Sequence, residues 1–276
     1  MSSRHIVKDV LKELTGRLKE SIPRASREAQ LLLMHHLGVD ELWLLMNQDE
    51  EVKDIEKLLE MAHRRAKNEP LEYILGRVSF YSEEFYIDSG ALIPRPETEL
   101  LIDEVLKNIE DKNAKLTIVE VGVGSGIISI MLAKSLPNAK FIAVDISEAA
   151  LSVARKNIEK FSLEHRIELR HGSLLEPIAE KIDYLVSNPP YIASDASLES
   201  NLSYEPQNAL FGGNVGDEII KELLDGVLKA KINLFSCEMG YDQKDKIRSY
   251  LNNRPLESLN FYKDYSDFDR GFTLRL

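Results

Sequence analysis

The chain has 276 residues, of which 43% are hydrophobic, so it is long enough for one large domain or two ordinary domains with buried cores. Its formal net charge of −11 argues against nucleic acid as a partner, because duplex binding usually needs a basic face that neutralises phosphates. No apolar run approaches the roughly 20 residues of a membrane span, and the first residues lack the apolar core of a signal peptide, so we expect a cytoplasmic protein without a membrane partner.

Residue types that bind metals are sparse in this chain. Cys237 is the only cysteine and lies in the apolar segment 232–237, where a packed, reduced thiol is expected. His35 and His36 are adjacent, so they cannot share one face of a helix. We therefore expect neither a disulfide framework nor a metal site.

Residues 1–75 have the pattern of a small all-helical bundle, because apolar residues recur there at helical spacing. Ser26 is predicted to cap the second helix, and Asp49 a further helix over residues 51–67. We expect Trp43 and the Leu and Met residues around it to be mainly core. The alternative is that part of this surface is a docking face.

Residues 76–92 have the pattern of a β-hairpin that links the bundle to the rest of the chain. Short alternating runs occupy residues 78–81 and 84–87, with Ser82 and Glu83 as the expected turn. From residue 93 onward, strands alternate with helices, which is typical of a mostly parallel sheet covered on both faces. The expected strands lie near Thr117, Lys140, Ile167, Ile182 and Ile232.

A glycine-rich loop follows the first of these strands. The apolar segment 116–121 runs into residues 122–126, which alternate glycine with other residues, and a helical pattern begins at Ile127. Glycines let a loop turn tightly and approach a ligand, and the first N–H groups of the helix face that ligand. The spacing is one residue shorter than the dinucleotide fingerprint, so the loop favours a nucleotide-like cofactor over a nicotinamide.

A second apolar strand, residues 140–144, ends at Asp145. An acid at this position can accept hydrogen bonds from both hydroxyl groups of a ribose. Taken alone, it could instead cap the helix expected near Ser147, and the glycine loop could be only a tight turn. The order and spacing of the two features together favour a cofactor site.

The segment Ser187-Asn188-Pro189-Pro190-Tyr191 follows a further apolar strand. Its two prolines fix φ and remove two N–H donors, which leaves carbonyl groups free as acceptors. An amide nitrogen is a poor nucleophile while its lone pair is delocalised, so acceptors for both of its N–H groups can hold that lone pair toward an electrophile. Asn188 Oδ1 and the Pro189 carbonyl are the candidate acceptors. Taken alone, this segment would be an ordinary Asn-Pro turn.

In this order the motifs resemble those of the class I S-adenosylmethionine-dependent methyltransferases, and more closely the protein-(glutamine-N5) methyltransferases that modify peptide chain release factors. Residues 70–76, 93–99 and 205–216 are similar to three further blocks of that family. The Ile-Pro-Arg-Pro-Glu-Thr block is the most specific, whereas Asn-Pro-Pro-Tyr is shared with amino-methylating DNA enzymes. The resemblance implies an α/β, Rossmann-like class I methyltransferase fold with a mostly parallel seven-stranded sheet ending in an antiparallel pair.

The resemblance also assigns roles along the chain. Residues 1–75 would recognise the protein substrate, and residues 93–276 would form the methyltransferase domain. The implied catalytic residues are Asn188, Pro189, Pro190 and Tyr191, which would also bind the substrate together with Arg95 and Glu97. The implied cofactor-binding residues are Glu120, Gly122, Val123, Gly124, Ser125, Gly126, Asp145, Ile146, Ser173, Leu174 and Asn188.

Three of these assignments have open alternatives. Ser173 stands where the family commonly carries an acid that contacts adenine, so the Ser173 hydroxyl or a backbone carbonyl would accept that hydrogen bond instead, while Leu174 offers an apolar contact to the ring. The alternative is that Ser173 belongs to a plain strand-to-loop turn. Tyr191 either packs against the substrate or is a wall residue. Arg95 and Glu97 belong to a turn that could simply cap the next helix.

The expected reaction transfers a methyl group from S-adenosyl-L-methionine to the side-chain nitrogen (N5) of a glutamine in the Gly-Gly-Gln motif of peptide chain release factors, leaving S-adenosyl-L-homocysteine. No dedicated base is required. One alternative is an amino-methyltransferase acting on adenine or cytosine of nucleic acid, which should show a recognition domain or basic stripe. Others are a glutamine methyltransferase of a ribosomal protein and a non-catalytic cofactor-binding module. We expect a monomer.

Overall fold

The computed structural model describes residues 5–198 and 200–276, which form two compact units. The smaller unit contains the described residues up to Arg77 together with residues 200–204. The larger unit contains Val78–Leu198 and Glu205–Leu276. Throughout the described part of the chain, every helix is too short or too polar to span a membrane.

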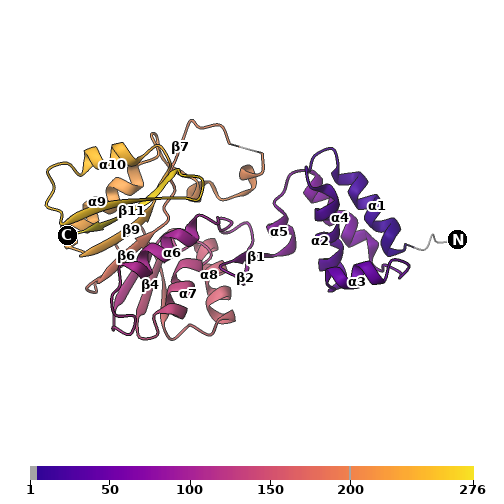
Figure 1. Ribbon diagram of the computed structural model, residues 1–276, viewed down its shortest axis with the longest axis horizontal. Helices are drawn as coiled ribbons and strands as arrows, with labels where there is room; N and C mark the ends of the chain where they lie inside the picture. The colour runs from indigo at the N-terminus through magenta and orange to yellow at the C-terminus, as the bar shows by residue number, and fades with distance from the viewer. Residues whose placement is uncertain (1–4, 199) are drawn as a thin grey trace. The chain divides into compact units, whose positions relative to one another are not determined.

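The smaller unit is a bundle of helices, drawn in indigo and purple in Figure 1. Its core consists of side chains that repeat at helical spacing, such as Leu14, Leu32 and Leu58, all fully buried. The helices are α1 Val7–Leu18, α2 Ala25–Leu37, α3 Glu41–Met46, α4 Ile55–Ala66 and α5 Leu71–Leu75, with the 3₁₀ turn η1 Leu202–Tyr204 in the same unit.

Two predicted helix caps are wrong. Ser26 lies inside the first turn of α2 and does not cap it. Asp49 precedes an extended segment, and α4 begins only after Asp54. The reason is a tertiary contact: the Val52 N–H donates to the His5 carbonyl oxygen at 2.8 Å, so this stretch pairs with the N-terminal segment before the helix can start.

The prediction that the apolar residues around Trp43 are mainly core is wrong for three of them. Leu44 is buried and Trp43 is half-buried against the core of the bundle. Leu42 and Leu45 are each 63% exposed, and Met46 is 76% exposed. A helix as short as α3 can place only one side on the bundle, so the apolar residues of its other sides remain in solvent.

The predicted hairpin is present, with its turn one residue earlier than expected. The strands are β1 Arg77–Phe80 and β2 Glu83–Tyr86. Tyr81 and Ser82 form the turn, with φ of +52° and +63°, as two-residue hairpin turns of this hand require. This register puts Phe80 and Phe85 in the core of the larger unit, whereas a slip of one residue would turn both outward.

The larger unit is built on a seven-stranded sheet in the order β10-β11-β9-β6-β3-β4-β5. In this sheet β11 runs opposite to the other six strands, so the predicted fold class and the closing antiparallel pair are confirmed. The strands are β3 Thr117–Val121, β4 Lys140–Asp145, β5 Ile167–His171, β6 Tyr184–Ser187, β9 Leu234–Glu238, β10 Ser258–Lys263 and β11 Asp269–Arg275.

Helices cover both faces of this sheet (Figure 1). Ile118 of β3 packs with α6, α7 and α8, and the next residue, Val119, packs with α9 and α10, as alternation along a doubly covered strand requires. The helices are α6 Thr98–Lys107, α7 Ile127–Ser135, α8 Glu148–Lys160, α9 Glu218–Ala230 and α10 Lys244–Tyr250. Outside the main sheet lie the parallel pair β7 Ile192–Ala193 and β8 Phe211–Gly213, and the 3₁₀ turn η2 Gln207–Ala209.

Candidate active site

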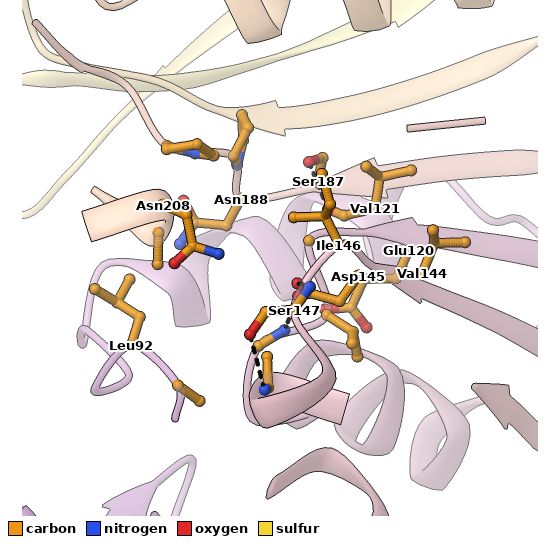
Figure 2. Close-up of a pocket in the computed structure, with 18 of the residues that line it drawn as sticks. Leu92, Glu120, Val121, Val144, Asp145, Ile146, Ser147, Ser187, Asn188 and Asn208 are labelled. Carbon is orange, nitrogen blue, oxygen red and sulfur yellow. Dashed lines mark hydrogen bonds between the residues drawn. The ribbon is translucent and has the colours of Figure 1, made fainter. Parts of the chain in front are cut away.

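A cavity of about 200 Å³ lies in the larger unit, at the edge where the parallel strands end (Figure 2). Most of the predicted site residues line it, whereas Glu97, Gly126 and Tyr191 do not. The predicted residues that the structure brings together there are Arg95, Glu120, Gly122, Val123, Gly124, Ser125, Asp145, Ile146, Ser173, Leu174, Asn188, Pro189 and Pro190.

The glycine loop between β3 and α7 is tied to the end of β4. Gly124 has φ of +54°, which costs little only for glycine, and its N–H donates to Asp145 Oδ2 at 2.9 Å. Asp145 Oδ1 accepts from the Ser147 N–H at 2.9 Å, and Ser147 in turn caps α8 by accepting from the Ala150 N–H at 3.2 Å (Figure 2). Since each carboxylate oxygen has two acceptor sites, Asp145 supports the loop and the helix start while retaining acceptor capacity toward the cavity.

Glu120, fully buried on β3, is among the residues that line the cavity and has one carboxyl oxygen without a partner in the described part of the chain. Its Oε2 accepts from the Ser129 N–H at 2.9 Å and from the Ser129 hydroxyl. Its Oε1 is buried and has no hydrogen-bond partner among the described residues. Burial raises the pKa of Glu120 to about 8, and the hydrogen bonds from Ser129 only partly oppose this. A buried carboxyl group in this state would be stabilised as the carboxylate by a cation.

Apolar side chains form another part of the cavity wall. Ile146, directly after Asp145, is 61% exposed although it is apolar. Leu174 also lines the cavity and has φ of +50°, an uncommon conformation for a branched residue. Ser173 stands beside it, so this wall offers ring contacts and a hydroxyl group in place of a carboxylate.

A chain of hydrogen bonds runs from the cavity into the core and orients Asn188. Asn188 Nδ2 donates to Thr98 Oγ1 at 3.1 Å, and Thr98 Oγ1 donates to Glu238 Oε2 at 2.8 Å. The Tyr191 hydroxyl donates to the other carboxylate oxygen, Glu238 Oε1, at 3.2 Å. Thr98 and Glu238 are 2% and 1% exposed. Tyr191 therefore points away from the cavity and holds the loop from behind.

Backbone contacts hold the Asn-Pro-Pro-Tyr segment in place. Gln243 Nε2 donates to the carbonyl oxygens of Tyr191 and Gly216, at 3.0 Å each. A Cβ atom on Gly212 would lie 2.5 Å from the Gly216 carbonyl oxygen and closer still to the Pro190 carbonyl oxygen. The glycines of residues 205–216, one of the blocks that resemble the family, thus allow two stretches of backbone to touch.

Arg95 and Glu97 take different positions. Arg95 lines the cavity and forms an ion pair with Glu205, with Nη2 and Oε1 2.5 Å apart. Glu205, almost fully buried, also accepts from the Ile93 N–H at 3.0 Å, so this acid joins the segment before α6 to the segment 205–216. Glu97 is the N-cap residue of α6, but its side chain makes no capping bond there.

Comparison with known proteins assigns the chain to a family. Residues 9–76 match the PrmC N-terminal domain, and residues 96–209 match the Methyltransferase small domain. A release factor glutamine methyltransferase of Clostridium botulinum is 38% identical over 283 residues, which cover 98% of this chain and 99% of that protein. The chain belongs to the release factor glutamine methyltransferase family. Another member, from Dictyoglomus turgidum, is 41% identical over 266 residues, covering 93% of this chain and 90% of its own.

Membership of the release factor glutamine methyltransferase family confirms the resemblance that the motifs indicated, and it makes the chain a methyltransferase. Among solved structures, the hMettl16 catalytic domain in complex with an RNA hairpin aligns with a TM-score of 0.59 over 80% of this chain and 82% of that one. The two sequences are only 16% identical, so this likeness shows the class I methyltransferase fold alone.

Sequence reasoning missed two residues that shape the site. Thr98 lies within the Ile-Pro-Arg-Pro-Glu-Thr block, where it received no role. Glu238 received none either, although the signal was present: it follows the apolar segment 232–237 directly, as Asp145 and Asn188 follow theirs. Polar residues at the carboxyl ends of parallel strands converge on one edge of the sheet.

Proposed function

We propose that this protein transfers a methyl group from S-adenosyl-L-methionine to the N5 atom of a glutamine, in the Gly-Gly-Gln motif of peptide chain release factors. The observation that carries the proposal is the placement of Asn188. Its side-chain amide lines the same cavity as Asp145 and Glu120 (Figure 2). Its Nδ2 atom donates a hydrogen bond to Thr98 Oγ1. Relatives named for this activity align along almost the whole chain.

The residues of the cavity fit S-adenosyl-L-methionine. Asp145 retains acceptor capacity for the ribose hydroxyl groups, and the unpartnered Glu120 Oε1 suits the ammonium group of the methionine part. Ile146 and Leu174 offer apolar contacts to the adenine ring, with the Ser173 hydroxyl as a weaker polar contact. When bound, the cofactor supplies a methyl group on a positively charged sulfur, which takes the electron pair of the carbon–sulfur bond as the carbon–nitrogen bond forms.

The chain's own residues position the nitrogen that is methylated. Asn188 Oδ1 and the Pro189 carbonyl would each accept a hydrogen bond from the glutamine NH₂ group. With both N–H groups held, the nitrogen lone pair is less delocalised into the amide carbonyl and points toward the cofactor. Pro190 keeps the loop free of a competing N–H donor, and Tyr191 holds it from behind through Glu238. The nitrogen becomes acidic as it is alkylated and loses a proton to water, so no general base is needed.

Several further assignments belong to the proposal. The helical residues 1–75 would help to recognise the release factor, with residues 76–92 as a linker and residues 93–276 as the catalytic domain. Arg95, which lines the cavity, and Glu97, which does not, would contact the protein substrate. The protein would act as a monomer in the cytoplasm and would not bind nucleic acid directly, which agrees with its net charge of −11.

The proposal is tested by finding where the methyl group goes. The purified protein is incubated with labelled S-adenosyl-L-methionine, an unmodified release factor and duplex DNA together, and the labelled residue is located by mass spectrometry. Label on the Gly-Gly-Gln glutamine is the expected result. A release factor whose motif glutamine is replaced by alanine serves as the control and should remain unlabelled. Label on DNA, or on neither polymer while the cofactor is bound, would overturn the proposal.

A further inference from the structure

The two ends of a primary amide look alike in shape but differ in chemistry. Asn188 can present either its Oδ1 acceptor or its Nδ2 donor group to the cavity, depending on how the amide is turned. Only the acceptor can bind a glutamine NH₂ group. Something in the structure must therefore choose between the two orientations.

The hydrogen-bond chain behind Asn188 makes this choice. The Thr98 hydroxyl has one hydrogen, and it donates that hydrogen to Glu238 Oε2 at 2.8 Å. An ionised carboxylate has no hydrogen to return, so toward Asn188 the Thr98 oxygen can only accept. The 3.1 Å contact must therefore be made by Asn188 Nδ2, and Oδ1 is the end left for a ligand.

We propose that Thr98 and Glu238 are positioning residues that fix the orientation of the Asn188 amide, so that its acceptor end faces the glutamine that is methylated. This inference rests on the proposed function, because it assumes that Asn188 binds the glutamine NH₂ group. Neither residue touches the reacting atoms through this contact. Each acts through Asn188. Which group donates and which accepts along these hydrogen bonds depends on the charge of Glu238.

The charge of Glu238 depends on its surroundings. Burial raises the pKa of Glu238 to about 7, and the hydrogen bonds from Thr98 and Tyr191 and the positive charge of Arg270 oppose the rise. The titratable or charged groups that face Glu238 are Tyr191 from the loop after β6, Glu97 at the start of α6, Arg270 of β11, Tyr262 of β10 and Cys237, which directly precedes Glu238.

Protonation of Glu238 would exchange donors and acceptors along the hydrogen bonds from Glu238 to Asn188. A proton on Oε2 is donated to Thr98, and Thr98 then turns its own hydrogen toward Asn188. The amide responds by presenting Oδ1 to Thr98 and Nδ2 to the cavity. Because the protonated form predominates below about pH 7, turnover should fall as the pH decreases through that value.

The test compares two substitutions at one position. Thr98→Val keeps the side-chain shape and removes the hydroxyl, so kcat should fall by about 10- to 100-fold while KM for the release factor stays within about twofold. The fall of kcat on the acid side of pH 7 should also disappear. Thr98→Ser keeps the hydroxyl and should recover most of the lost kcat. The matched control is Thr273→Val, which deletes another buried hydroxyl in the larger unit, bonded to Ser236 at 2.7 Å.

A second readout does not depend on turnover. Carbon-13 NMR of the glutamate carboxyl groups, with Glu238→Gln used to assign the signal, follows the titration of Glu238 in the unliganded protein. Because the Thr98 hydrogen bond lowers the pKa of Glu238, Thr98→Val should move this titration to higher pH. If Thr98→Val does not fold, Glu238→Gln carries the test, because its amide does not titrate and its kcat should no longer fall on the acid side of pH 7.

The outcomes separate the inference from the proposed function. Wild-type kcat and an unchanged acid-side fall in Thr98→Val, or in Glu238→Gln, would overturn the inference. The proposed function would still stand if Asn188→Ala were inactive in the same assay. Full activity of Asn188→Ala would instead remove the role of Asn188 and the inference with it, whereas the proposed function fails only if the wild-type protein does not label the release factor.

Discussion

The two sides of the cavity are built from hydrogen bonds that differ greatly in the sequence separation of their partners. On the cofactor side, which we define as residues 120–147, Asp145 and Gly124 are 21 residues apart and Glu120 and Ser129 are nine apart. On the transfer side, defined as Asn188–Tyr191 with Thr98 and Glu238, the hydrogen-bonded partners are 90 and 140 residues apart. The cofactor side thus forms within neighbouring strands and helices, whereas the transfer side requires α6, β6 and β9 to come together.

This difference implies that substitutions can impair one side of the cavity without impairing the other. Changes on the transfer side should lower turnover while cofactor affinity persists. Changes on the cofactor side should alter cofactor affinity first. The following substitutions are ordered from the largest expected effect to the smallest.

Asn188→Ala should give the largest difference between the loss of turnover and the loss of cofactor affinity. Removing the acceptor that we propose for the glutamine nitrogen should lower kcat by about 100- to 1,000-fold, as loss of one preorganised polar group does in other active sites. Cofactor affinity, measured by isothermal titration calorimetry, should change by less than about threefold, because Asp145 and Glu120 remain. A folded mutant that no longer binds the cofactor would contradict the separation of the two sides.

Gly212→Ala should disturb the transfer side without touching a polar side chain. The added Cβ would collide with the carbonyl oxygens of Pro190 and Gly216, so the backbone that carries Asn188 must shift. A misplacement of about 1 Å costs roughly 100-fold in rate. The control is Gly16→Ala in α1, where a Cβ meets nothing within 4 Å and should stabilise the helix by about 0.5–1 kcal/mol. Both variants are assayed for kcat, cofactor affinity and melting temperature.

Cofactor binding should release protons through Glu120. In the free protein burial raises the pKa of Glu120 to about 8, so the carboxyl group is largely protonated at neutral pH. A bound ammonium group favours the carboxylate, so affinity should rise by up to about tenfold per pH unit as the pH increases toward 8, and level off above it. Calorimetry in two buffers of different ionisation enthalpy measures the protons released. Glu120→Gln should abolish this release, and an unchanged value in that variant would exclude Glu120 as the source.

The ion pair of Arg95 with Glu205 should contribute mainly to stability. Arg95→Met leaves the buried carboxyl group of Glu205 with only the Ile93 N–H, so the free energy of unfolding should fall by about 1–3 kcal/mol. Arg17→Met is the matched control, since its pair with Glu13 is exposed on α1 and should contribute only about 0.3–0.5 kcal/mol. Urea denaturation of both variants measures the difference, and equal losses would show that burial of Glu205 adds nothing.

The fold, and the gathering of the glycine loop and Asp145 at one cavity, could be predicted from the sequence because both depend on local patterns. Strand and helix periodicity, the glycine loop and the acid at the end of β4 can each be recognised from a few adjacent residues. Asn188 was also recognisable from its motif. The hydrogen bond between Thr98 and Glu238 was not, because it joins side chains that are 140 positions apart. The prediction that Asp49 caps a helix was wrong for a similar reason. Val52 pairs with the distant residue His5, so the helix begins several residues later than expected.

The membership of residues 200–204 in the smaller unit bears on how this chain could be recombined with its relatives. The chain passes from the smaller unit to the larger one after Arg77, returns for this short segment and leaves again at Glu205. Within the smaller unit, the Tyr204 hydroxyl donates to the Lys67 carbonyl oxygen at 2.8 Å. A chimera spliced once, after Arg77, would join one parent's helices to the other parent's version of this segment. The two stretches should therefore be exchanged, and inherited, as a matched pair.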